Sequence, residues 1–299
     1  MSDTNEVTAS VPALKPRKKR FELPPQWKTA YGIIGVVVVA FWLIVAIIGP
    51  LLPLADPLAQ TAERLAAPSS AHWFGTDELG RDVFSRVLYG ARISIPVAIA
   101  LVVLSMLLGG LLGMLAGYFG RVLDETIMRL ADIVLAFPPI ILAMVITAAL
   151  GPGIGNAVIA MLVVNWPQYA RIMRSMVVGV RGSEYVISDR LLGFSAWQTL
   201  RVDVLPNVVS SILVLATLDF GNAILLLSGL SFLGLGAVPP TPEWGFMVSE
   251  GVQNFSAWWI ATFPGLCISS VVIAFNFIGD TLRDALDPHM RKHVQSEAM

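Results

Sequence analysis

Charge and cysteine are both scarce in this sequence of 299 residues. Charged residues make up 14% of the chain, against about 25% in ordinary soluble domains. Cys267 is the single cysteine, so an internal disulfide and a cysteine-based metal cluster are both excluded. Lysine occurs only near the two ends, at Lys28 or earlier and at Lys292, which excludes a phosphate-binding G-x-x-x-x-G-K-S/T loop from the body of the chain. If ATP is used, another polypeptide hydrolyses it.

Histidine is rare as well, whereas apolar residues are abundant. His72, His289 and His293 all lie outside the long apolar runs, which excludes a histidine metal site or a Ser/His dyad inside a membrane. Hydrophobic residues make up 56% of the chain and the mean hydropathy is +0.72, both outside the range of soluble domains. The composition therefore predicts a membrane protein with no catalytic residues and no metal of its own.

Long intervals that hold one charge or none predict the membrane spans, each of which needs about 20 apolar residues. These intervals cover 29–55, 93–120, 133–170, 204–242 and 251–279, and the fourth contains Asp219. The interval 133–170 is too long for one span, and Gly151-Pro152-Gly153 divides it into two. The expected fold is an all-α membrane protein with six transmembrane helices.

Lysine and arginine are divided unequally between the two sides of these spans. With a cytoplasmic N-terminus, 16 of the 20 lie on the cytoplasmic side, and the others are Arg64, Arg81, Arg86 and Arg92. Because basic residues gather on the cytoplasmic side, both termini are predicted to be cytoplasmic. A signal peptide is the competing interpretation of the first apolar run. That run exceeds the ~7–15 residues of a signal core, and no clear A-x-A site follows it.

The predicted organisation follows from these spans. Val83, Phe84, Val87 and Leu88 recur at helical spacing, so a short amphipathic helix on the membrane surface is expected there. The parts are a disordered basic tail (1–29), the first span (30–52), an external segment with that amphipathic helix (53–92), a five-helix core with a cytoplasmic loop at 181–206 (93–280) and a cytoplasmic tail (281–299).

Asp219 is the one charge well inside a predicted span, and Asn222 follows one turn later. Intramembrane carboxylates usually mark ion or solute pathways, so both side chains are candidates for lining a polar path. The alternative is that a neighbouring helix hydrogen-bonds the carboxylate, or that Asp219 lies at a shallower depth. The sequence leaves both interpretations open.

Small and aromatic residues carry structural expectations. Gly109, Gly113 and Gly117 follow Ser105 at every fourth position, which predicts a helix face that packs closely against another helix. Trp244, Trp258 and Trp259 fall at the predicted outer boundary of the membrane, where tryptophan side chains serve as anchors.

The segment EYVISDRLLGFSAWQTLRVDVLPN, residues 184–207, is the most polar stretch between two spans. Ser183 and Glu184 favour a helix start, and Gly193 favours its end. Ser195 and Gln198 have the spacing of a capping box, which predicts a second helix reaching Leu205 before Pro206. An apolar strip runs along both helices through Ile187, Leu191, Phe194, Trp197, Leu200 and Val204. This strip either lies on the bilayer or docks into a groove of a soluble partner.

The same segment resembles the cytoplasmic loop of membrane subunits of bacterial ABC importers, which has the pattern E-A-A, three residues, Gly, nine residues, I-x-L-P. Gly193 and Leu205-Pro206 match in spacing, whereas Ile187-Ser188-Asp189 replaces E-A-A and Asp203 takes the usual apolar position. Three more segments, at 74–94, 230–250 and 256–288, resemble the C-type permease subunit of dipeptide and oligopeptide importers: FGTDELGRDVFSRVLYGARIS, LSFLGLGAVPPTPEWGFMVSE and SAWWIATFPGLCISSVVIAFNFIGDTLRDALDP. With the six-span plan, the resemblance covers roughly residues 28–290.

This resemblance implies a type I importer permease in the bacterial inner membrane. Such a subunit pairs with a B-type permease around the pore, docks on two ATPase subunits that bind ATP and Mg, and receives its substrate from a periplasmic or lipid-anchored binding protein. It holds no cofactor itself. The resemblance assigns the docking turn to Ser188, Asp189, Arg190 and Gly193, with Leu205 and Pro206 before the fifth span. Because the usual Glu is missing at Ile187, Glu184 or Asp189 is expected to make the ATPase contact.

The resemblance also gives the outer loop a function. Pro239, Pro240, Pro242 and Trp244 belong to a segment expected to be stiff and to lie near the binding protein, although it also fits an ordinary turn between spans. A secondary carrier or channel that uses Asp219, and a scaffold protein without transport activity, are the alternative functions. The sequence does not distinguish dipeptides, longer peptides, glutathione, opines and nickel complexes as substrates.

Overall fold

The computed structural model describes residues 27, 29–52, 54–60 and 62–286. Most of the predicted basic tail and of the C-terminal tail therefore lies outside the described residues. Within the described part the chain is helical, with one isolated β-bridge between Thr76 and Asp82. The helices are α1 (Ala30–Ile48), η2 (Gly49–Leu51), α2 (Val83–Phe119), α3 (Arg121–Leu135), α4 (Pro139–Leu150), α5 (Ile154–Arg181), α6 (Glu184–Leu191), α7 (Ala196–Thr199), η3 (Leu200–Val204), α8 (Leu205–Phe232), α9 (Trp244–Gln253) and α10 (Trp259–Leu286).

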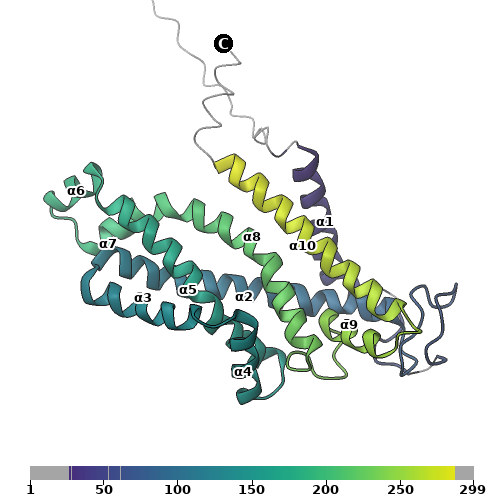
Figure 1. Cartoon of the computed structure of the whole chain (residues 1–299). Coiled ribbons are helices and arrows are strands. Elements are labelled where there is room, and N and C mark those ends of the chain that lie inside the picture. Colours follow the sequence, from purple (N-terminus) through teal and green to yellow (C-terminus); the bar gives the residue numbers. More distant parts are fainter. Residues whose placement is uncertain (1–26, 28, 53, 61, 287–299) are drawn as a thin grey trace, which may run out of the picture.

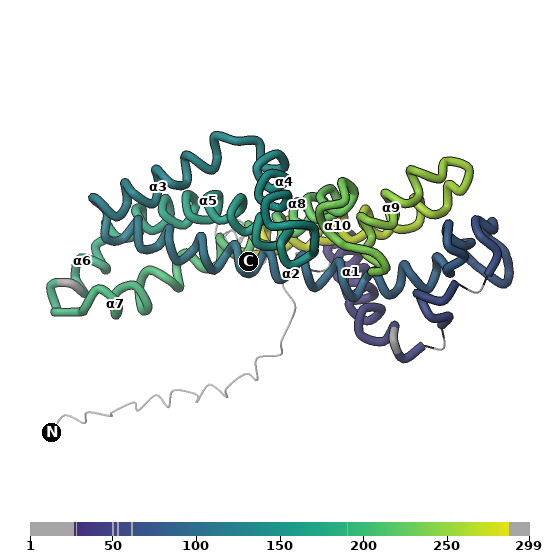
Figure 2. The backbone as a smooth tube through the Cα atoms, turned by 90° about the horizontal axis from the view of Figure 1, so that it is seen from below, coloured from purple at the N-terminus to yellow at the C-terminus, as the bar shows by residue number. Residues whose placement is uncertain are grey.

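The helices form an elongated assembly with different elements at its two ends. The short helices α6 and α7 lie at one end, and α9 lies at the other together with the segment that precedes α2 (Figures 1 and 2). α1 and α10 pack side by side, with Gly35 of α1 against the backbone of Ala274. The short helices and the irregular segment thus lie at the two ends of the long helices.

Several helices are long and apolar enough to cross a membrane. In the described residues four pass this test: α1, α2, the continuous run Ala196–Phe232 and α10. α3 and α4 together give a fifth candidate, although they meet at an angle of 91°. The structure thus supports a multi-pass protein with four or five candidate spans.

The third predicted span is not one straight helix. The expected break at Gly151-Pro152-Gly153 is present between α4 and α5, but the chain also bends between α3 and α4. Pro138 and Pro139 explain this bend, because proline cannot donate its backbone nitrogen to a preceding turn and the residue before proline avoids the helical conformation. Counting charge-free residues could not locate it.

The expected short surface helix is absent as a separate element. Asp82 caps a single helix of 37 residues, α2, that includes both the amphipathic stretch and the following span. Val83 and Val87 are buried within the protein, so this stretch packs against other parts of the chain. Apolar spacing identified the helix but could not show which surface its apolar face would cover.

The glycines of α2 bring this helix very close to α5. A Cβ atom on Gly109 would lie 2.3 Å from the carbonyl oxygen of Trp166, and one on Gly113 would lie 2.2 Å from that of Ala170. For Gly117 the nearest atom is the carbonyl oxygen of Arg174, at 2.9 Å. The small face therefore lies against the backbone of α5 along three turns.

Ion pairs join α3 to α5 beside this contact. Arg174 pairs with Asp124, with 2.6 Å between Nη2 and Oδ2, and Arg171 pairs with Asp132. Both arginines are on α5 and both aspartates on α3, so α2 and α3 flank the same helix. The position of α5 is thereby fixed from two sides.

Candidate coupling loop and membrane path

The loop between α5 and α8 is a pair of short helices with a sharp turn between them. Gly193 has φ +90°, a left-handed conformation that suits glycine at the end of a helix. The capping box at Ser195 and Gln198 is present: the Ser195 hydroxyl accepts from Gln198 N at 3.3 Å, and Gln198 Oε1 accepts from Ser195 N at 2.8 Å. Local sequence rules therefore fix the turn and the second helix start.

Two details of this loop differ from expectation. The Ser183 hydroxyl does not cap α6 but donates to the carbonyl of Val180 at 2.7 Å, at the end of α5. The second helix also continues past Pro206: α7 passes through a π-helical turn, Leu200–Val204, directly into α8. Pro206 is tolerated because it lies in the first turn of α8. The loop is thus joined to α8 without an interruption.

The apolar strip of the loop is exposed in one half and buried in the other. Leu191 is 84% exposed, Leu192 77% and Trp197 61%, whereas Leu200 and Val204 are fully buried. The buried half fixes η3 against the bundle. The exposed half belongs to α6, α7 and the turn between them, at one end of the molecule in Figure 1. Large apolar side chains that remain this exposed commonly mark interaction sites.

The polar residues predicted for the docking turn lie on α6. Glu184 is exposed, and its carbonyl accepts from the Ser188 hydroxyl at 2.8 Å. Asp189 is half-buried and interacts with Asp203. Oδ2 of Asp203 is buried and receives no hydrogen bond from a described donor. The two aspartates that set this loop apart from the E-A-A pattern therefore face each other; the side chain of Arg190 is outside the described structure.

The two candidate lining residues of α8 differ in their surroundings. Asp219 is only 7% exposed, and its Oδ2 accepts a hydrogen bond of 2.8 Å from the hydroxyl of the fully buried Tyr169 on α5. Asn222 is exposed, and its Nδ2 donates to Oδ1 of Asp219 at 3.5 Å. Asp219 therefore lies in a hydrogen-bonded contact between α8 and α5, which is one of the two interpretations that the sequence left open. Asn222 lies on an exposed face of α8.

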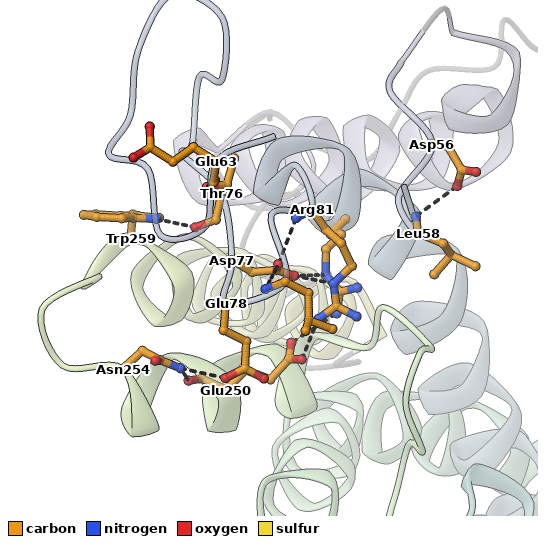
Figure 3. A network of polar contacts seen from close by, with 12 residues as sticks. Asp56, Leu58, Glu63, Thr76, Asp77, Glu78, Arg81, Glu250, Asn254 and Trp259 are labelled. Atoms are coloured by element: carbon orange, nitrogen blue, oxygen red, sulfur yellow. Dashed lines mark hydrogen bonds and ion pairs between the residues drawn. The ribbon is translucent and has the colours of Figure 1, made fainter. Parts of the chain in front are cut away.

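A buried charge network at the opposite end was not foreseen. Arg81 donates to Asp77 at 2.5 Å and to Glu250 of α9 at 2.7 Å, and Arg86 donates to the other oxygen of Glu250 at 3.1 Å. Figure 3 shows Asp77, Arg81 and Glu250 converging where the segment before α2 meets α9. All four side chains are buried, and two positive groups face two negative groups when all are ionised. Burial raises the pKa of Glu250, although Arg86 and Arg81 act in the opposite direction.

This network acts as a clamp between the segment before α2 and α9. Arg81 and Arg86 come from 164 or more residues before Glu250 in the sequence. The sequence shows only that Asp77 and Arg81 are four residues apart, a spacing that allows an ion pair. Glu250 of α9 joins this pair to Arg86, and the sequence does not indicate that contact. Only the tertiary structure brings these charges together.

Two of the expected tryptophan anchors are core residues instead. The indole of Trp244 is fully buried and donates to the carbonyl of Val87 at 2.9 Å, and that of Trp259 donates to Thr76 at 3.0 Å. Trp258 is the exposed one. Glu243 caps α9 and accepts from Ser94 at 3.0 Å, so the loop that contains Pro239, Pro240 and the buried Pro242 is fixed to α2. Trp244 and Trp259 are thus buried by contacts with α2 and with the segment before it, although their positions in the sequence had suggested the membrane boundary.

The described residues contain no cluster of three or more His, Cys, Asp or Glu that could hold a metal ion. The features of the site are an exposed apolar loop, a buried carboxylate between helices and a buried charge network at the opposite end. With four or five candidate spans, they belong to a polytopic membrane protein.

Comparison with known proteins identifies the class. The chain belongs to the family of binding-protein-dependent transport system inner membrane components, whose sequence profile matches residues 109–292. It is therefore a permease subunit of an ABC importer that spans the membrane several times, and its family is one of transport proteins, not of enzymes.

Individual relatives narrow the assignment. The dipeptide transport system permease protein DppC of Alkalihalophilus pseudofirmus is 43% identical over 94% of this chain and 95% of its own length. The protein of the same name from Escherichia coli K12 is 45% identical over 87% and 90%. The glutathione transport system permease protein GsiD of Pectobacterium atrosepticum is 45% identical over 75% of each chain.

Proposed function

We propose that this chain forms half of the pore through which small peptides enter a bacterial cell. The partners are a second, B-type permease, two ATPase subunits and a binding protein that delivers the substrate from outside. The dipeptide permeases among the relatives support peptides as the substrate class. In this assignment α5 joins the five candidate spans as the fourth in chain order, which gives six, and both termini are in the cytoplasm of a bacterial inner-membrane protein.

The exposed half of the loop carries the coupling part of this proposal. Leu191, Leu192 and Trp197 are among the most exposed apolar side chains of the chain, and a soluble partner that covered them would gain their burial. Short capped helices suit this role because they transmit a movement to α8 that a flexible segment would absorb. ATP and Mg are bound by the ATPase subunits, and this chain needs no cofactor.

A carrier that works alone is less well supported. Such a carrier requires a titratable group that opens to the path, and Asp219 is enclosed by Tyr169 and α5. No second described carboxylate lies beside it. An importer needs no such group, because the ATPase supplies the energy.

The test is the double variant Leu191→Ser/Leu192→Ser in the complete importer. A buried leucine contributes about 1.5–3 kcal/mol, so loss of both removes about 3–6 kcal/mol and is expected to weaken ATPase docking by at least about 100-fold. Copurification of the ATPase and its stimulation by the loaded binding protein should both fall. Val122→Ser is the matched control, because Val122 is 77% exposed but lies on α3. Unchanged docking in the double variant would refute the role of the loop.

A further inference from the structure

A cavity of about 400 Å³ lies between α5, α8 and α10 and is lined by both polar and apolar side chains. We call it the α8–α10 cavity, and it is formed by Ile172, Ser210, Ser211, Val214, Leu215, Leu218, Arg283 and Leu286. Its volume is in the lower part of the range of small-molecule sites, about 300–1,000 Å³. α8 and α10 touch where Gly279 meets Leu218, and the Leu205 end of α8 and the Leu286 end of α10 lie apart in Figure 1.

The polar side chains that line this cavity have no partners in the described structure. Several helical Ser and Thr hydroxyls of the chain donate to the preceding turn, as Ser188, Ser269 and Thr281 do. Ser210 and Ser211 make no such bond, and Arg283 pairs with no described carboxylate. Asp280 and Asp284 are exposed on the same helix but do not line the cavity. Arg283 and Ser211 are exposed and Ser210 is half-buried, so one cationic group and two hydroxyls without a described partner line a cavity whose other side chains are apolar.

The position of the cavity on α8 favours a solute over a lipid. α8 is exposed along two faces. Val209 and Leu213 are exposed on one face, beside an apolar cavity lined by methionine and leucine side chains of α2. The other face carries Ser211 and Asn222, both exposed. Polar side chains within membrane helices face water-filled paths or the bundle interior, whereas lipid tails match the apolar face.

We infer that the α8–α10 cavity binds the carboxylate of a peptide in transit, with Arg283 and the Ser210 and Ser211 hydroxyls as donors. This inference rests on the proposed peptide transport and adds a binding site to it. A guanidinium recognises a carboxylate through two parallel hydrogen bonds, and the hydroxyls take its remaining lone pairs. The apolar walls, Val214 and Leu218 among them, suit a variable side chain of the peptide.

A single introduced thiol tests the site without relying on transport. Because Cys267, the one native cysteine of this chain, is buried, Ser211→Cys provides a specific label position on this chain, and the labelled subunit is separated from the rest of the importer before it is quantified. The quantity measured is the ratio of its labelling rate with an anionic methanethiosulfonate to that with a cationic one. We expect this ratio to be about fivefold higher when Arg283 is present than in the double variant Ser211→Cys/Arg283→Gln. Arg283→Lys should keep this ratio. The control Arg129→Gln removes an exposed arginine of α3 and should leave the ratio unchanged.

Protection from labelling identifies the ligand. A dipeptide with a free carboxylate should slow the reaction of Ser211→Cys, and its C-terminal amide should not. An unreactive thiol, a ratio independent of Arg283, or equal protection by both peptides would overturn the inference. So would protection by anionic phospholipid in nanodiscs, which would make the cavity a lipid site. Uptake of the dipeptide by the same complex is measured separately, so its absence would refute the peptide function and not the cavity chemistry.

Discussion

Gly113→Ala is expected to destabilise the contact between α2 and α5, and the structure gives the size of the effect. The added Cβ would lie 2.2 Å from the carbonyl oxygen of Ala170 and 2.8 Å from its Cα, both backbone atoms that no side-chain rotation can move. The helices must therefore separate, and such overpacking costs about 1–3 kcal/mol. Alanine regains about 1 kcal/mol over glycine in a helix. With the steric cost at the upper end, the expected net loss is about 1–2 kcal/mol.

Gly110→Ala is the matched control on the same helix. Its Cβ would have the flexible end of Met173 as its nearest atom, at 3.5 Å, an ordinary contact. This variant keeps the gain in helix propensity and should be as stable as the parent or more so. Thermal unfolding of the purified permease complex compares the two variants. A Gly113→Ala protein that melts at or above Gly110→Ala would refute the close-packing argument.

Three further variants test the buried polar groups. Burial raises the pKa of Glu250 because it penalises the charged form, so the fold is most stable, as far as this group is concerned, below the ordinary glutamate pKa and loses that stability as pH rises through the raised pKa. Relative to Glu250→Gln, the parent should lose melting temperature over that window, and parallel curves would contradict this. Arg86→Met leaves buried carboxylates in excess and should cost about 3–5 kcal/mol in chemical unfolding, whereas a cost near zero would show that the clamp is dispensable. Asp219→Asn should leave transport rate and selectivity unchanged if the carboxylate serves the contact with Tyr169; altered selectivity would restore its lining role.

Local signals predicted a large part of this architecture. Apolar runs located the long helices, Gly151-Pro152-Gly153 marked a true break, and Ser195 and Gln198 formed the capping box. These features depend on residues close together in sequence, which is why they can be read directly. The bend at Pro138-Pro139 was missed because the criterion was the absence of charge, which does not register helix direction.

Features that depend on distant contacts could not be predicted. The residue type and position of Trp244 and Trp259 are those of membrane anchors. Only their hydrogen bonds to α2 and to the preceding segment show that they are core residues. The pairing of Glu250 with Arg81 likewise joins elements far apart in the chain. Asp219 was recognised as unusual, but its environment depended on Tyr169, a residue with no sequence signal of its own.

The central claim is that this chain admits peptides only as part of an ATP-driven complex. Radiolabelled dipeptide uptake into proteoliposomes tests it, with this chain reconstituted either alone or with the second permease, the ATPases and the binding protein. The account predicts uptake by the complete complex when ATP and Mg are supplied on the ATPase side, and none by the chain alone under any ion gradient. Gradient-driven uptake by the chain alone would contradict it.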